Sequence, residues 1–242
     1  MGPIQGYLSA FGDETPCAVL APLFPCYLDG PDDLETFTVL RSPTVRYDRV
    51  LLSILDEVAT YWPGIETDRV FMMGFSGGGQ FVHRFMYLYP ERLAGVSIGS
   101  QAHTTALDDS RNWPVGIADV ESLFGRKVNR ELIGKFPIQL VIGSEDNGVV
   151  DDFWVWLDQE QAQMNAAGTS EFESARGTVW QTRMRRPRDV TFREFRGMLG
   201  HNGIKTQLDV VKGANHNGDA VREDVLRYLR DLIREEFPGA GA

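Results

Sequence analysis

The chain of 242 residues has only two cysteines, Cys17 and Cys26, and neither belongs to a metal-binding motif. So few cysteines exclude a disulfide framework. Buried or half-buried thiols are the expected state, with a single bridge between the two as the alternative. We expect no metal ion and no cofactor.

The sequence also lacks a basic, apolar leader and any run of about 18 apolar residues that could span a bilayer. Positive charge is scarce, because Lys and Arg number 24 against 34 Asp and Glu, for a net charge of −10. A chain this acidic repels phosphate backbones and anionic lipid, so neither nucleic acid nor a membrane is an expected partner. The sequence as written therefore predicts a cytoplasmic protein with a small-molecule partner. Its oligomeric state stays open.

What is present is an alternation of short apolar runs and longer helical patterns. Runs bounded by proline or glycine predict strands at residues 17–21, 69–73, 93–98, 137–142 and 207–211. Apolar residues at helical spacing predict helices across Leu51–Trp62, Phe81–Leu88, Phe192–Leu199 and Val221–Ile233. This alternation is typical of an α/β fold with a mostly parallel sheet flanked by helices.

Two stretches do not fit simple crossovers between strands. Residues 100–136 and 147–186 follow expected strands, where loops over a site belong in open α/β sheets. We interpret them as cap or lid segments of a single domain over residues 1–242. The second stretch contains a basic cluster, for which a solvated surface is the expectation and an anion site the alternative: Arg183, Arg185, Arg186 and Arg188.

Residues 74–78 read Gly-Phe-Ser-Gly-Gly, which matches the G-x-S-x-G nucleophile elbow. The expected strand before Ser76 and the expected helix after it supply the context that this motif needs. Small residues flank the serine because larger ones would collide in so tight a turn. The Gly77 amide, at the helix start, is well placed to bind a developing oxyanion. Ser76 is therefore the candidate nucleophile.

A serine nucleophile needs a base, and His216 is the best candidate among the four histidines. It lies in a glycine-rich loop after the last expected strand. His83 falls within a helix and is expected to pack there. His201 lies at a helix end, where it can bond terminal carbonyls, and His103 is a candidate for lining a pocket.

The acid that orients the base is expected after the strand at 137–142, because the order in this fold is Ser, acid, His. Asp146 is our choice, and it lies 70 positions after Ser76 and 70 before His216. Glu145 is the nearest alternative. Asp151 and Asp152 are more distant ones.

The run from Gly74 to Phe85, with Tyr89-Pro-Glu-Arg92 and Val96-Ser-Ile-Gly99, resembles the polyhydroxybutyrate-depolymerase-like branch of the α/β-hydrolases. The similarity extends over roughly residues 16–235 and includes the segments around Asp146 and His216. It implies an α/β-hydrolase fold and hydrolysis of carboxylic esters without a cofactor. It identifies no substrate.

The sequence departs from that family at its start. There, a strand ending in a His-Gly type motif precedes the region that Val19–Pro25 resembles, and its loop gives the second oxyanion amide. Here 16 residues precede Cys17 and none of them reads His-Gly. Either the chain is shortened and lacks N-terminal strands, or another loop supplies the amide, with Leu23 or Phe24 as candidates.

These observations favour a serine esterase that uses Ser76, Asp146 and His216 and passes through an acyl-enzyme. The same triad can serve an acyltransferase, a lactonase or a peptidase. A binding protein without catalysis, built on a hydrolase scaffold, is the alternative from a different class.

Overall fold

The described sheet is built from four parallel strands in the order β1-β2-β3-β6. A computed structural model describes residues 11–15, 17–25, 27–30, 36–151 and 185–238. The strands are β1 (Val70–Phe75), β2 (Leu93–Gly99), β3 (Ile138–Gly143) and β6 (Gln207–Val211). These agree with four of the predicted strands. Because all four run in one direction, their carboxyl ends and following loops meet at the same edge of the sheet.

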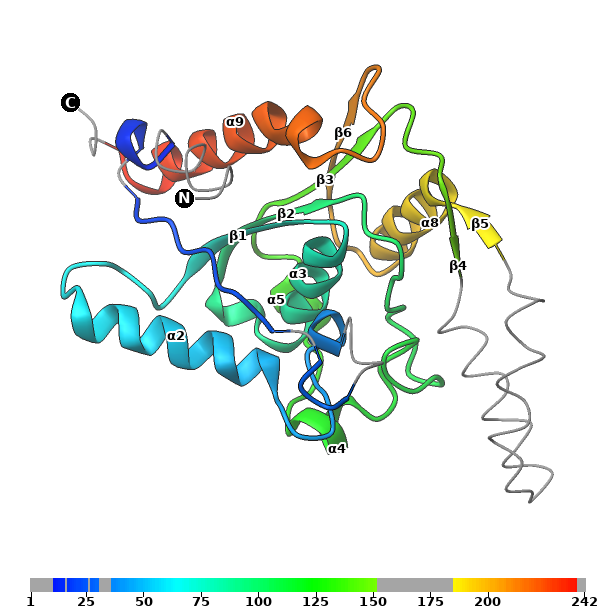
Figure 1. Ribbon diagram of the computed structural model, residues 1–242, viewed down its shortest axis with the longest axis horizontal. Coiled ribbons are helices and arrows are strands. Elements are labelled where there is room, and N and C mark those ends of the chain that lie inside the picture. The colour runs from blue at the N-terminus through cyan, green and yellow to red at the C-terminus, as the bar shows by residue number, and fades with distance from the viewer. Residues whose placement is uncertain (1–10, 16, 26, 31–35, 152–184, 239–242) are drawn as a thin grey trace.

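Helices cover both faces of this sheet (Figure 1). The helical elements with given bounds are η1 (Thr36–Val39), α2 (Tyr47–Tyr61), α3 (Gly77–Leu88), η2 (Pro90–Arg92), α4 (Val120–Phe124), α5 (Arg130–Ile133), α8 (Arg188–His201) and α9 (Gly218–Glu236). Helix α9 lies on one side of the sheet, and α2 and α3 lie on the other. The α/β architecture is therefore confirmed.

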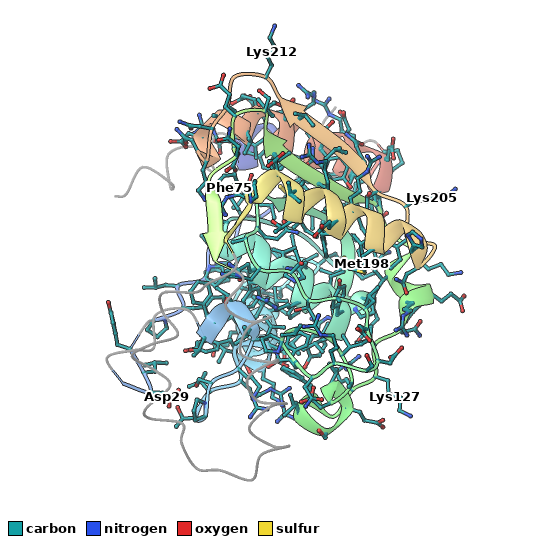
Figure 2. All side chains as sticks on the ribbon, turned by 90° about the vertical axis from the view of Figure 1, so that its right-hand side faces the viewer. Asp29, Phe75, Lys127, Met198, Lys205 and Lys212 are labelled. Atoms are coloured by element: carbon teal, nitrogen blue, oxygen red, sulfur yellow. The ribbon has the colours of Figure 1, made fainter. Side chains whose placement is uncertain are left out.

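The two faces of the sheet carry separate hydrophobic clusters because side chains alternate along a strand. Leu140 of β3 belongs to the larger cluster, which includes the apolar residues of α3 and α8. Its neighbour Val141 belongs to the cluster beneath α9. Figure 2 shows α8 in front of the larger cluster, with Met198 labelled on it.

Strands β2 and β3 are buried along their whole length, whereas the residues of β1 are half-buried or exposed. The difference follows from position, since β1 is an edge strand of the described sheet. The predicted apolar stripes of α3, α8 and α9 are all buried. Helix α2 ends at Tyr61, and Trp62, which we expected on its buried face, is 60% exposed.

The prediction of a strand at residues 17–21 is wrong, because the structure assigns these residues to no strand. Val19 and Leu20 are each 42% exposed. A short apolar run becomes a strand only when a neighbouring strand takes up its backbone groups, and sequence periodicity does not report that partner. Cys17 is a free, half-buried thiol whose pKa is raised by burial, while Cys26 lies outside the described residues.

The two expected cap segments differ in how much of them is described. Residues 100–136 include α4 and α5, and their buried Leu107 and Ile117 pack into the larger cluster. Of residues 147–186, the structure describes a two-stranded antiparallel ribbon, β4 (Val149–Asp151) with β5 (Arg185–Pro187), and the rest lies outside the described residues. A lid role stays a prediction for both.

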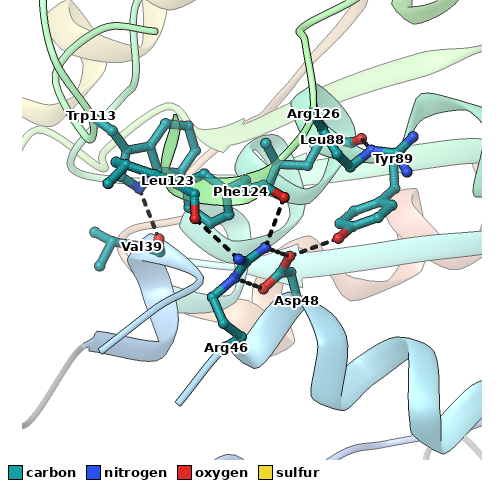
Figure 3. A network of polar contacts seen from close by, with 9 residues as sticks. All are labelled: Val39, Arg46, Asp48, Leu88, Tyr89, Trp113, Leu123, Phe124 and Arg126. Carbon is teal, nitrogen blue, oxygen red and sulfur yellow. Dashed lines mark hydrogen bonds and ion pairs between the residues drawn. The ribbon is translucent and has the colours of Figure 1, made fainter. Parts of the chain in front are cut away.

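A buried polar network joins the start of α2 to α4 and η2 (Figure 3). Arg46 donates to both carboxylate oxygens of Asp48, at 2.9 and 2.7 Å, and to the Leu123 carbonyl at 3.1 Å. Tyr89 donates to the same carboxylate at 2.8 Å. Burial, reinforced by this bond to Asp48, raises the pKa of Tyr89 to about 12. The Asp48 side chain is wholly buried, so these partners supply the hydrogen bonds that water would otherwise provide.

None of the helices in the described ranges combines the length and the apolar character needed to cross a bilayer.

Candidate active site

Ser76 occupies a strained turn between β1 and α3. Its φ of 55° and ψ of −116° are unusual for a residue with a side chain. The Ser76 N–H donates to the carbonyl of Gly99, at the end of β2, over 2.8 Å. This bond anchors the turn to the neighbouring strand, so the serine sits at the carboxyl edge of the sheet.

Glycine is needed at two positions near Ser76, the first residue of the motif and the residue just after it, whereas a Cβ at Gly78 would meet nothing within 4 Å. A Cβ at Gly74 would lie 2.2 Å from the Gly78 carbonyl oxygen, and one at Gly79 would lie 2.7 Å from the Gly99 oxygen. Both obstacles are backbone atoms, which cannot rotate away. The sharp turn that presents Ser76 therefore depends on backbone packing that only glycine allows.

His216 contacts both of the other residues proposed for the triad. Its Nε2 lies 3.0 Å from Ser76 Oγ, and its Nδ1 lies 2.9 Å from Asp146 Oδ2. An imidazole with its proton on Nδ1 can donate to the carboxylate and accept from the serine hydroxyl. The structure thus brings together three residues from the loops after β1, β3 and β6.

The loops that carry Asp146 and His216 are bonded to each other. Ser144 N–H donates to the Val211 carbonyl at 2.9 Å, and Glu145 N–H donates to the Ala214 carbonyl at 2.8 Å. Gly143 is needed beneath this contact, because a Cβ there would lie 2.2 Å from the Ala214 oxygen. Pairing of β3 with β6 and these bonds fix the two loops side by side.

The alternatives to Asp146 are less well placed or lie outside the described residues. Glu145 is exposed and uses its backbone, not its carboxylate, in the contact with the His216 loop. The side chain of Asp151 and the whole of Asp152 lie outside the described residues. Asp146 is 1% exposed and bonded to His216, which makes it the acid that the geometry favours.

The His216 ring packs against Phe75. The Phe75 ring lies 4.9 Å from it, centroid to centroid, with an interplanar angle of 33°. The imidazole is 35% exposed, so it packs against Phe75 and still remains open to solvent.

The oxyanion donors stay predictions. Gly77 begins α3, where backbone N–H groups lack intrahelical partners, and a Cβ on it would meet Phe37 and Thr38 of η1 at 3.6 Å. The Leu23 side chain is 90% exposed. The Phe24 ring stacks on Phe81 at 4.9 Å and lies 6.2 Å from Phe37. Phe37 therefore neighbours both Gly77 and the Phe24 ring.

His83 and His201 take the structural roles expected of them. The Thr105 N–H donates to His83 Nε2 at 3.1 Å, so the ring proton is on Nδ1 and donates to the Gly79 carbonyl at 3.1 Å. Burial, and next the neighbouring Arg84, lowers the pKa of His83 well below its usual range. His201 bonds the Gly197 carbonyl of its own helix at 3.2 Å. A pocket role for His103 stays a prediction.

Two arginines near the site were not predicted to have a role there. Arg84 is fully buried in α3 and donates to Thr105 Oγ1 and the Thr38 carbonyl, both at 2.8 Å, thereby tying η1 and the loop after β2 to the helix. Arg188, expected in a solvated cluster, has a side chain only 13% exposed, with Nε 3.1 Å from Asp146 Oδ1. That expectation is wrong for Arg188, because charge patterning cannot reveal a partner 42 positions away.

Among the described residues, no group of three or more His, Cys, Asp or Glu side chains is arranged to hold a metal ion.

The chain is similar to two solved structures. Poly(aspartic acid) hydrolase-1 from Sphingomonas sp. KT-1 is 18% identical, with a TM-score of 0.51 over 77% of this chain and 64% of that one. LpqC, the poly(3-hydroxybutyrate) depolymerase from Bordetella parapertussis, is 18% identical, with a TM-score of 0.49 over 79% of this chain and 58% of that one. The chain thus spans about three-fifths of the length of these proteins.

No protein-family model matches the sequence, and neither does any curated protein. The parallel sheet, the strained elbow after β1 and the likeness to poly(aspartic acid) hydrolase-1 nevertheless define the fold. The chain has the α/β-hydrolase fold, as the resemblance of its motifs implied.

Proposed function

We propose that the chain is a serine hydrolase that cleaves carboxylic esters through an acyl-enzyme intermediate. The observation that carries the proposal is the hydrogen-bonded series Ser76–His216–Asp146, with distances of 3.0 and 2.9 Å, on an elbow held in strained geometry. Strained backbone at a nucleophile persists only where the surrounding structure imposes it.

In the first step, His216 Nε2 takes the hydroxyl proton while Ser76 Oγ attacks the ester carbonyl. The resulting oxyanion is stabilised by the Gly77 N–H and a second donor, for which Leu23 or Phe24 are our candidates. His216 then returns the proton to the leaving alcohol, and the acyl group remains on Ser76. Asp146 accepts the Nδ1 proton of His216 in a hydrogen bond and stabilises the imidazolium.

In the second step, His216 takes a proton from water, whose oxygen attacks the acyl carbonyl. His216 then returns the proton to Ser76 Oγ as the acyl–oxygen bond breaks and the acid leaves. In both steps the imidazolium charge develops beside the Asp146 carboxylate, whose side chain is buried. The acidic surface of the molecule, with a net charge of −10, favours neutral or cationic esters over strongly anionic ones.

The proposal is tested by following the hydrolysis of p-nitrophenyl acetate and longer p-nitrophenyl esters. Ser76→Ala and His216→Gln are each expected to lower kcat by at least ~10⁴-fold, because the residues act as a unit. Ser53→Ala, on an exposed position of α2, is the matched control and should keep the wild-type rate. Turnover by Ser76→Ala equal to that of the wild type would contradict the assignment of Ser76 as the nucleophile.

The panel should also contain amides, lactones and an alcohol acceptor, because a Ser-His-Asp series can act on each. Poly(aspartic acid) and poly(3-hydroxybutyrate) belong in it as well, since solved structures with this fold bear the names of enzymes for these polymers. Ester turnover that exceeds amide turnover supports the esterase. A preference for amides would indicate a peptidase or an amidase in place of an esterase.

A further inference from the structure

The carboxylate of Asp146 is engaged on both of its oxygens. Oδ2 bonds His216 Nδ1 at 2.9 Å, while Oδ1 forms an ion pair with Arg188 Nε at 3.1 Å. The Asp146 side chain is completely buried. A buried carboxylate without a compensating charge is costly and either takes up a proton or turns toward another donor. The guanidinium thus occupies the side of the carboxylate that His216 leaves free.

Arg188 is itself fixed in place by contacts with two further segments. Its backbone N–H donates to the Gly148 carbonyl at 3.0 Å, two positions after Asp146. Its side chain donates to the Ser100 carbonyl at 3.3 Å, just past the end of β2. As the first residue of α8, it directly follows β5. Arg188 therefore joins the loops after β2 and β3 to the start of a helix.

Burial of this guanidinium changes its pKa. Burial lowers the pKa of Arg188 from its ordinary value, and the carboxylate of Asp146 acts in the opposite direction. An arginine titrates so far above neutrality that it stays charged after such a shift.

We propose that Arg188 is a positioning residue for the reaction, acting through Asp146. It holds the carboxylate in the rotation that directs Oδ2 at His216 Nδ1, and so fixes the imidazole against Ser76. This inference rests on the proposed function. It adds a fourth residue, from the start of α8, to the three that were predicted from the sequence.

The test measures the rate constant for covalent labelling of Ser76 by a fluorophosphonate probe. Arg188→Gln keeps a polar side chain but removes the charge, and we expect it to lower the rate by about 100-fold, the effect of a small displacement at a reacting group. Arg188→Lys restores the charge without the planar fork and should lie between, about three- to tenfold below the wild type. Arg193→Met, on an exposed position of the same helix, is the matched control and should label like the wild type.

A second readout separates positioning from a general effect on packing. The His216 Nδ1 proton is expected to give a low-field NMR resonance, assigned by its loss in His216→Gln. In Arg188→Gln that resonance should move or disappear, while thermal unfolding shows that the protein is folded. In Arg193→Met it should not move.

Labelling of a folded Arg188→Gln within about twofold of the wild-type rate, with the resonance unmoved, would overturn the inference. If that variant does not fold, Arg188→Lys decides in the same way: a wild-type rate with an unmoved resonance overturns the proposal. A wild type that is not labelled at all contradicts the proposed function instead. The NMR comparison then still decides whether Arg188 orients the Asp146–His216 pair.

Discussion

The turn at residues 74–79 and the segment at residues 17–25 look alike in sequence, since an apolar run closed by glycine precedes the first and an apolar run closed by proline opens the second. The structure separates them. The first is enclosed, with a Cβ at Gly74 only 2.2 Å from a backbone oxygen, whereas Leu23 in the second is 90% exposed. Close backbone packing can be recognised in a sequence, because it requires glycine at fixed positions. An extended segment depends on distant partners, and its own sequence gives no comparable pattern.

The largest expected effect comes from Gly74→Ala, which attacks the enclosed turn directly. The added methyl group would overlap the Gly78 carbonyl, so we expect a loss of about 4 kcal/mol or more in the free energy of unfolding and no detectable ester hydrolysis. Gly78→Ala is the control, because a Cβ there meets nothing within 4 Å. Urea unfolding should show it to be as stable as the wild type or up to about 1 kcal/mol more so. Equal stability of the two variants would contradict our reading of the turn.

Asp48→Ala tests whether the buried polar network contributes as much to the free energy of unfolding as the backbone packing at the elbow does. It would leave Arg46 and Tyr89 without their shared partner, and we expect a loss of about 3 kcal/mol, measured by urea unfolding. Asp56→Ala, on an exposed position of the same helix, should change stability by less than about 0.5 kcal/mol. A loss in Asp48→Ala as small as that of its control would show that the network is dispensable.

The pH dependence of stability tests the enclosed region through His83. Its folded-state pKa is lowered, so the unfolded chain binds the proton first and stability falls as the pH drops below about 6.5. The slope from this one group approaches about 1.4 kcal/mol per pH unit. His83→Gln should flatten the curve between about pH 6.5 and 5.5, whereas His201→Gln, on an exposed histidine, should leave it unchanged. A curve that is the same in all three proteins would refute the prediction.

The smallest effect on stability is expected in the exposed segment. Leu23→Ser should alter the free energy of unfolding by less than about 0.5 kcal/mol, as judged by urea unfolding. Leu23→Pro asks a different question, since proline removes the backbone N–H. If this amide is the second oxyanion donor, kcat falls by about 100-fold or more in Leu23→Pro but not in Leu23→Ser. Equal rates in the two variants would exclude the Leu23 amide.

The elbow and the order of Ser76, Asp146 and His216 could be predicted because each depends on local signals. These are glycines at a turn, and loops that follow recognisable strands. The strand at 17–21 was predicted wrongly because a ladder needs a partner that the segment itself does not encode. Arg188 was missed for a related reason: its contact with Asp146 depends on how α8 packs, and a basic side chain looks alike in water and beside a buried carboxylate. The residues that support the site are therefore harder to predict from the sequence than the three that are proposed to react.

Activation of Ser76 is the central claim, and covalent labelling by a fluorophosphonate probe with mass-spectrometric mapping of the adduct tests it most directly. We predict a single adduct on the peptide that contains Ser76, absent in Ser76→Ala. A folded wild type that forms no adduct, or a Ser76→Ala variant that is labelled equally well, would contradict the account.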